Sequence, residues 1–149
     1  IEKIATRNMF YDEKGNHDAE RLFWRIAMKP GSPLLCGLYQ DKLMICLSGN
    51  PFAALCCFEV FAVPTLRRLS GETSIDAKRV KTRLRGEFPK PSPGRRLIRA
   101  VFDGETVRPA SGNHSSGSLS ANIGCNCLID IPAGTGALHQ GDEVEVVLI

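Results

Sequence analysis

The feature that most constrains the fold is a change of sequence character at Gly71. Before it, a largely apolar stretch beginning at Pro51 predicts a buried helix, and Asn50 suits the N-cap position. After it, short alternating apolar segments are separated by glycine- and proline-rich turns, a pattern typical of a small barrel or sandwich. We therefore expect α/β followed by all-β, with residues 1–71 in the first part and residues 72–149 in the second.

Three short apolar segments precede the expected helix. Leu22–Met28 predicts a buried strand, which the turn-forming sequence Lys29–Pro33 ends. Leu34–Leu38 and Leu43–Leu47 are joined by four residues, the signature of a hairpin with a four-residue loop. Together with the helix, these segments predict the α/β portion.

The composition, 43% hydrophobic and 23% charged, is that of a globular protein with a real core. No run approaches the roughly 18 apolar residues of a membrane-spanning helix, so we expect no membrane partner. The six cysteines include no C-x-x-C pair and no histidine at zinc-ligand spacing. We therefore expect free thiols, no metal site within this chain, and a reducing, cytoplasmic location.

Nine basic residues against one acid lie between Lys78 and Arg99. Such a patch can attract phosphate or nucleic acid. The alternative is the solvated face of a strand, because most of the basic residues alternate with others. No aromatic residues are interleaved to stack on bases, so we favour the strand face and expect no nucleic-acid partner.

The strand, turn and helix around Gly49 form the most informative local feature. Loops that lead from strands into helices commonly bind ligands, and the free N–H groups at a helix start favour an anion. Gly49 permits close backbone approach, Asn50 adds donors and an acceptor, and Lys29 at the end of another strand can present a fixed positive charge. The alternatives are a plain capped turn and an ordinary surface lysine.

A second candidate is the small polar loop Gly112–Ser118. Its small side chains and hydroxyl groups can wrap an oxyanion. The alternative is an ordinary surface loop. His114 is at best a hydrogen-bond donor, since no serine and carboxylate accompany it to form a hydrolase triad.

The order and spacing of several segments resemble the molybdopterin molybdotransferases, the family of the bacterial MoeA proteins and the gephyrin E domain. The resemblance covers about residues 20–149. The segments that carry it are Phe23–Gly31, Leu47–Pro51, Pro64–Gly71, Gly124–Pro132 and Gly141–Val144.

This resemblance implies that residues 1–71 are the last part of a three-layer α/β, MogA-like pterin-binding domain, and that residues 72–149 form a small C-terminal β-barrel. It implies a role in molybdenum cofactor biosynthesis: insertion of molybdate into adenylylated molybdopterin with release of AMP. It also implies Mg²⁺ with ligands upstream of this chain, and a homodimer in the full-length protein. This chain alone is expected to be inactive.

By the same resemblance, Lys29 is the expected catalytic residue and helps to hold molybdate or the pterin phosphate. The turn at Gly49 is expected to line the pterin pocket, and the β domain to supply oxyanion contacts. The residues implied to bind pterin or molybdate are Lys29, Ser32, Gly49, Asn50, Pro51, Arg95, Arg99, Ser115 and Ser116.

Three positions depart from the family pattern. Ser32 stands in place of a second lysine, Ser48 in place of a proline, and Ala53 in place of a serine. These changes leave an alternative open, a non-catalytic scaffold or oxyanion-binding relative, and gephyrin shows that the fold can carry a scaffolding role. Intact carboxylates upstream would favour the enzyme, and their loss would favour the scaffold.

Overall fold

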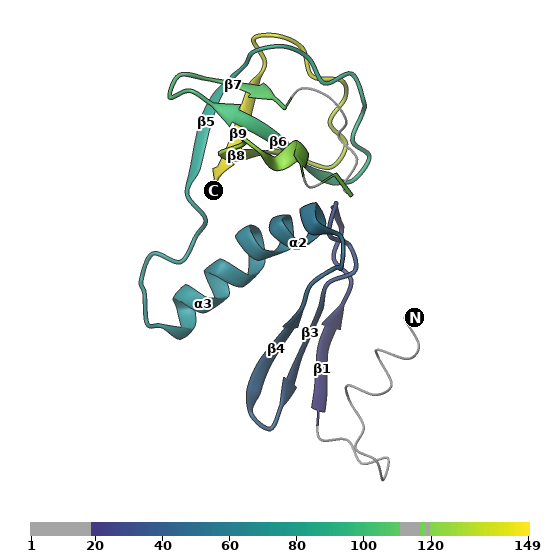
Figure 1. The fold of residues 1–149 in the computed structure, drawn as a ribbon, viewed down its shortest axis with the longest axis vertical. Coiled ribbons are helices and arrows are strands. Elements are labelled where there is room, and N and C mark those ends of the chain that lie inside the picture. Colours follow the sequence, from purple (N-terminus) through teal and green to yellow (C-terminus); the bar gives the residue numbers. More distant parts are fainter. Residues whose placement is uncertain (1–18, 111–116, 119) are drawn as a thin grey trace.

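The computed structural model describes residues 19–110, 117–118 and 120–149. Figure 1 shows a long helix lying between two β structures, a small sheet on one side and a barrel on the other. The small sheet and the helix come before residue 72, and the five barrel strands come after it. This order, an α/β portion followed by an all-β portion, confirms the predicted fold class.

The small sheet is antiparallel, with strand order β1-β3-β4. Its strands are β1 (Ala19–Trp24), β3 (Leu35–Tyr39) and β4 (Lys42–Cys46). The predicted hairpin is confirmed, but its loop has two residues rather than four, because Tyr39 pairs with Lys42. Gln40 and Asp41 form the loop with φ of 48° and 60°, the left-handed conformation of a tight type I′ turn.

The predicted buried strand Leu22–Met28 is wrong. Arg25 has a φ of 73°, so the chain turns there, and the Arg25 N–H donates to the Leu34 carbonyl at 2.8 Å. Beyond the turn, the short strand β2 (Met28–Lys29) leaves the small sheet and joins the barrel. β1 is an edge strand with mostly exposed side chains, Leu22 among them.

One helical stretch follows, in three consecutive pieces. They are α2 (Pro51–Cys57), the π-helical turn η1 (Phe58–Ala62) and α3 (Val63–Leu69). Asn50 caps α2 as predicted, because its Oδ1 accepts a hydrogen bond from the Ala53 N–H at 3.2 Å. The π turn immediately precedes α3, whose second residue, Pro64, has no N–H and so removes one bond from the helical ladder.

The helix ends at Gly71, which has a φ of 81°. The Gly71 N–H donates to the Arg68 carbonyl at 3.2 Å, and the Glu72 N–H donates to the Arg67 carbonyl at 3.0 Å. This pair of bonds is the Schellman motif, which favours glycine at its left-handed position. None of the helices in the described ranges is long and apolar enough to cross a membrane.

Five strands close into the barrel. They are β5 (Arg79–Leu84), β6 (Arg95–Phe102), β7 (Thr106–Pro109), β8 (Cys127–Ile131) and β9 (Glu143–Leu148), with the 3₁₀ helix η2 (Ser120–Asn122) before β8. Their order is β6-β7-β5-β9-β8, and β8 pairs again with β6 to complete the circle. This confirms the predicted small barrel. β2 runs parallel to β6 on its outer side.

Successive residues of the barrel strands face two different cores. Side chains such as Ile98 and Ile129 point inward and form the core of the barrel. Their neighbours Leu97, Leu128 and Val147 point outward and belong to a second core. β6 and β8 are therefore covered on both faces, which the sequence pattern did not predict.

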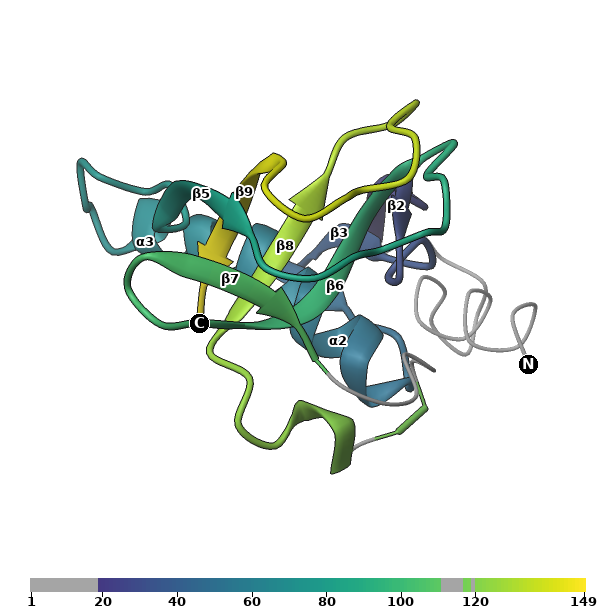
Figure 2. The same cartoon turned by 90° about the horizontal axis from the view of Figure 1, so that it is seen from above.

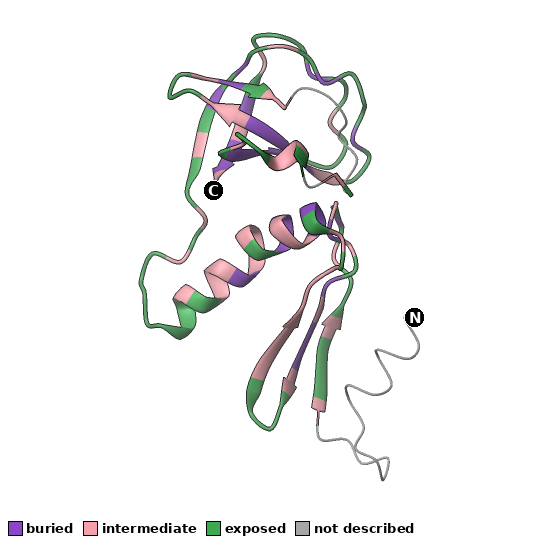
Figure 3. Cartoon of the chain, in the orientation of Figure 1, coloured by how far each residue is buried: buried purple, intermediate pink, exposed green. Residues whose placement is uncertain are grey.

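The helix supplies the other half of this second core. Phe52, Cys56 and Cys57 are at most 3% exposed, and they pack with the outward-facing barrel residues. On the side of the small sheet, the rings of Phe23 and Phe61 meet edge to face with centroids 5.4 Å apart. Figure 3 shows this burial along the helix and the barrel strands, whereas β1 is mainly exposed. Burying each large apolar side chain contributes roughly 1.5–3 kcal/mol.

Gly31→Ala is expected to lower the free energy of unfolding by about 2–4 kcal/mol, measured by urea denaturation. Gly31 is buried with a φ of 105°, and an added Cβ would lie 2.5 Å from the Cys57 Sγ. Gly94→Ala is the control, because a Cβ there meets nothing within 4 Å and the change should stay below about 1 kcal/mol. Equal effects of the two substitutions would show that the contact with Cys57 is unimportant.

Candidate functional site

Lys29 is exposed and lies on β2, directly opposite Arg96 of β6. Figure 2 shows β2 running beside β6 at the edge of the barrel. Ser32 follows in the turn after β2 and is half-buried. The Ser32 carbonyl accepts hydrogen bonds from the Ile26 N–H at 3.0 Å and the Leu34 N–H at 2.9 Å, so its backbone fixes this turn. The geometry therefore presents Lys29 to solvent from a well-defined backbone.

The turn from Gly49 to Pro51 begins the helix. The Ser48 Oγ accepts a hydrogen bond from the Asn50 N–H at 3.2 Å, and the Asn50 side chain caps the Ala53 N–H. Pro51, at the first helical position, has no N–H that needs an acceptor. A Cβ added at Gly49 meets nothing within 4 Å, which leaves open space beside the turn.

Arg95 is held by a carboxylate. Its Nε and Nη2 donate to the two oxygens of Asp130 at 2.9 and 2.7 Å. The same carboxylate accepts a hydrogen bond from Arg79 at 2.8 Å, and Arg79 also pairs with Glu145. Burial alone would raise the pKa of Asp130, but the hydrogen bonds from Arg95 and Arg79 outweigh it and lower the pKa. The positive charge of Arg95 is thus largely balanced by Asp130 within the barrel wall.

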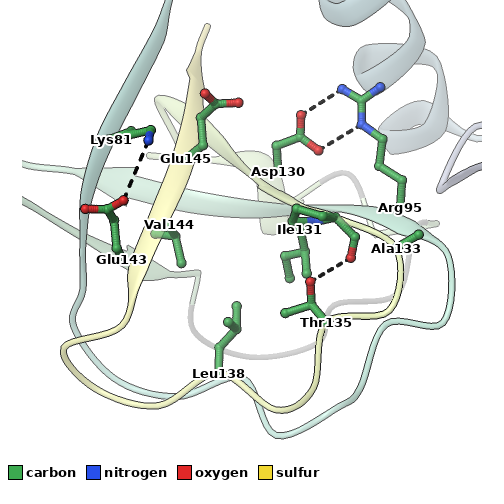
Figure 4. Close-up of a pocket in the computed structure, with 11 residues that line it drawn as sticks. Lys81, Arg95, Asp130, Ile131, Ala133, Thr135, Leu138, Glu143, Val144 and Glu145 are labelled. Atoms are coloured by element: carbon green, nitrogen blue, oxygen red, sulfur yellow. Dashed lines mark hydrogen bonds and ion pairs between the residues drawn. The ribbon is translucent and has the colours of Figure 1, made fainter.

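A pocket of about 650 Å³ lies beside this ion pair, on β5, β8 and β9 (Figure 4). Its charged residues include Arg95, Asp130 and the exposed pair Lys81–Glu143, and apolar side chains such as Leu138 form part of its wall. Of the residues predicted to bind pterin or molybdate, Arg95 is the one among its described lining. The pocket and the turn at the helix start are therefore different places in the fold.

Arg99 lies four residues after Arg95 on the same outer face of β6, but its side chain is only 1% exposed. Its guanidinium stacks on the Phe52 ring, 3.8 Å from the centroid. Its Nη2 donates to the Ser118 carbonyl at 3.1 Å, and its Nε donates to the Asn122 side-chain oxygen. Burial lowers the pKa of Arg99. Arg99 therefore joins β6, the first turn of α2 and the segment before β8.

Sequence analysis missed Phe52 and Asn122 as partners of Arg99. No local signal marks either residue, because the contacts join segments far apart in the chain. Ser115 and Ser116, like His114, lie outside the described residues, so their predicted roles stay predictions.

The cysteines are all free, as predicted. Cys56 and Cys57 lie in the core between helix and barrel, and burial raises the pKa of Cys56 to about 12. Such a thiol is inert at neutral pH. Within the described ranges, no three His, Cys, Asp or Glu side chains gather closely enough to hold a metal ion.

Asp130→Asn is expected to lower the free energy of unfolding by on the order of 2 kcal/mol at pH 7, because two arginines lose their shared carboxylate. The folded pKa of Asp130 is lowered, so its stabilising effect is full above the unfolded pKa of about 4. The effect is lost as pH falls through the lower folded value. Urea denaturation at a series of pH values down to about 2 measures the difference between wild type and variant, which should shrink in acid.

Glu143→Gln is the matched control for this experiment. Its ion pair with Lys81 is 3.8 Å long and exposed, so its loss should cost less than about 1 kcal/mol. A cost for Asp130→Asn that stays constant down to the lowest pH would contradict the proposed origin of its stabilisation.

Arg99→Met and Phe52→Leu are each expected to lower the free energy of unfolding by about 1–3 kcal/mol. Because they remove the same stacked contact, the double variant should lose less than the sum of the two. The control pairs Arg99→Met with Arg68→Gln, an exposed residue of α3, and should be additive within about 0.5 kcal/mol. Additivity in both pairs would mean that the stacking contributes nothing.

Comparison with known proteins identifies relatives for most of the chain. Residues 81–149 match the family model described as the MoeA C-terminal region (domain IV). A molybdopterin molybdenumtransferase of Staphylococcus aureus is 34% identical over 134 residues, which are 87% of this chain and 32% of the relative. One of Bacillus subtilis is 36% identical over 137 residues, 88% of this chain and 31% of the relative. The chain thus spans about a third of the length of these relatives.

Solved structures give the same result. A molybdopterin biosynthesis MoeA protein from Pyrococcus horikoshii superposes with a TM-score of 0.75 at 27% identity, covering 88% of this chain and 32% of that one. A molybdenum cofactor biosynthesis protein from Pyrococcus furiosus has a TM-score of 0.72 at 22% identity, covers 88% of this chain and 46% of that one, and supports the fold alone. The predicted family is confirmed: the chain is a relative of the C-terminal portion of the MoeA family of molybdopterin molybdotransferases.

Proposed function

We propose that this chain supplies part of the substrate-binding surface of a molybdopterin molybdotransferase, an enzyme of molybdenum cofactor biosynthesis. The observation that carries the proposal is the similarity, over 87% of the chain, to a curated protein named molybdopterin molybdenumtransferase. The proposed reaction is insertion of molybdate into adenylylated molybdopterin, with release of AMP. Activity is proposed to need the longer protein, because the chain spans only about a third of such relatives.

Lys29 is the residue we propose to act on the anionic substrate. Molybdate and the pterin phosphate both carry negative charge, and a fixed ammonium group stabilises such charge as it develops or shifts. Lys29 is exposed on a short strand whose position the barrel determines. Ser32 and the open turn at Gly49–Pro51 are proposed to line the same surface. Ser115 and Ser116 keep their predicted place as oxyanion contacts.

Arg95 and Arg99 are proposed to support this surface from beneath. Arg95 is bound to Asp130, and Arg99 is buried against Phe52, so both act by fixing strand β6 and the start of the helix. Their loss would therefore misplace the surface. This differs from the direct oxyanion contacts that the resemblance implies for them.

Two of the three departures from the family pattern are compatible with the enzyme, because they leave the turn before the helix unchanged. Ser48, where the family has a proline, still supports the turn, because its Oγ accepts the Asn50 N–H. The N–H of Ala53, where the family has a serine, still receives the Asn50 cap. The turn that begins the helix is therefore intact despite both replacements.

The described residues do not form a group suited to magnesium, so we derive no step through the Mg²⁺ that the resemblance implies. We propose that the longer protein is a cytoplasmic homodimer. We also propose that the chain divides at residue 72 into the end of the pterin-binding domain and the barrel domain.

A chimera tests the function. This chain replaces the matched C-terminal third of the Bacillus subtilis relative, and the purified chimera is assayed for molybdenum cofactor formation from adenylylated molybdopterin and molybdate. We expect activity in the chimera, and a loss of about 100-fold in its Lys29→Ala variant, because a fixed charge at the substrate is removed. Arg68→Gln, which removes a distant exposed charge, should leave the rate unchanged.

The decisive contrary result is a chimera that melts cooperatively near the temperature of the parent enzyme but forms no cofactor. In that case the scaffold becomes the better interpretation. Full activity in the Lys29→Ala variant would keep the enzyme but remove Lys29 from its proposed role.

A further inference from the structure

Cys57 connects the helix to the turn that follows Lys29. Its Sγ lies 3.3 Å from the Gly31 carbonyl oxygen, to which the thiol donates a hydrogen bond across 26 positions of the chain. Both residues are buried, and Cys57 is 0% exposed. Burial raises the pKa of Cys57, so the thiol keeps the proton that it donates. A buried carbonyl without a donor costs free energy, so this bond has a structural task.

Gly31 packs against one face of the helix at two points. A Cβ added at Gly31 would lie 2.5 Å from the Cys57 Sγ and 3.5 Å from the Ala53 carbonyl oxygen. Ala53 and Cys57 are four positions apart in α2, so they lie on the same face, one turn after the other. The close approach depends on the missing side chain of Gly31. The first two turns of α2 therefore form the surface against which the turn after Lys29 packs.

The same helix carries the other part of the candidate site. The Asn50 side chain caps the Ala53 N–H and so fixes the turn at the helix start. The carbonyl of that same Ala53 lies beside Gly31. One short piece of helix thus holds two turns that are far apart in the sequence. The contact between Gly31 and Cys57 sets the spacing between them.

We propose that Cys57 is a positioning residue for Lys29. Its thiol holds the Gly31 carbonyl, two residues after Lys29, and so sets where the ammonium group stands relative to the turn at Asn50. The inference rests on the proposed function, in which Lys29 acts on the anionic substrate and the turn at the helix start lines the same surface. A small displacement of a group at the reacting centre costs much of the rate, so a buried thiol outside that surface controls it.

Kinetics of the chimera with the Bacillus subtilis relative test the proposal. Cys57→Ala should lower kcat/KM for molybdate about tenfold, and it should change the same parameter, kcat or KM, that Lys29→Ala changes. Cys57→Ser keeps a donor for the carbonyl and should stay within about threefold of the parent chimera. In the Lys29→Ala background, Cys57→Ala should change kcat/KM by less than about twofold, because the side chain that it positions is gone.

Cys127→Ala is the matched control. Cys127 is also 0% exposed, but it lies in the core inside the barrel. Its replacement removes a buried thiol of the same size away from the turn, so kcat/KM should stay within about twofold of the parent. An equal loss in Cys127→Ala and Cys57→Ala would mean that only general packing is involved, and it would overturn the proposal.

Native-state amide exchange of this chain gives a readout that does not depend on activity. The Ile26 and Leu34 N–H groups donate to the Ser32 carbonyl at 3.0 and 2.9 Å within the turn. In Cys57→Ala, exchange at both amides should be about fivefold faster than in wild type, because the turn loses its anchor on the helix. Exchange of the Leu148 N–H, which is hydrogen-bonded at 2.9 Å in the barrel, should be unchanged.

The proposal is also overturned if Cys57→Ser loses as much rate as Cys57→Ala, or if the effect of Cys57→Ala persists in the Lys29→Ala background. If Cys57→Ala fails to fold, the isosteric pair Cys57→Thr and Cys57→Val carries the same tests, because only threonine keeps a donor. An active chimera with unchanged kcat/KM in Cys57→Ala would refute this inference alone. An inactive chimera, together with faster exchange of the turn amides in Cys57→Ala, would refute the proposed function alone.

Discussion

The packing of the helix against the outside of the barrel is the contact on which the rest of the structure depends. Leu97, Leu128 and Val147 face outward from three barrel strands and meet Phe52 and its neighbours in α2. This contact covers the barrel wall, brings the start of the helix to β6, and leaves β2 beside the same strand. The exposed lysine and the supporting arginines owe their positions to it, because each lies on β2 or β6.

Local sequence signals predicted the elements well. The Asn50 cap, the hairpin of β3 and β4, and an all-β part were predicted from turn residues and alternation, which act over a few positions. Those signals left barrel and sandwich open, and the family resemblance implied the barrel. The break at Arg25 was missed because no glycine or proline marks it. β8 reads as an alternating strand, yet it is buried at all five positions. That burial depends on a helix some 70 positions earlier in the chain, which no local pattern reports.

The sequence predicted which residues belong to the candidate site better than it predicted how their side chains are arranged. Lys29 and the turn at Asn50 stand where strand ends and helix starts were expected. Among the arginines of β6, a shift of one position exchanges one face of the strand for the other. Arg95 therefore binds the Asp130 carboxylate on the outer face, while Arg96 projects from the opposite face of the strand. Sequence patterns locate such a cluster, but the pairing of strands decides which face of the barrel wall each arginine is on.

The double covering of the barrel wall also limits how this part of the protein can be handled. A barrel separated from the chain at residue 72 would expose Leu97, Leu128 and Val147 to water as one contiguous apolar surface. Such a fragment would bury this surface against another molecule, or it would aggregate. The helix thus shields the apolar outer face of the barrel, and the two are best expressed and transferred between proteins as one unit.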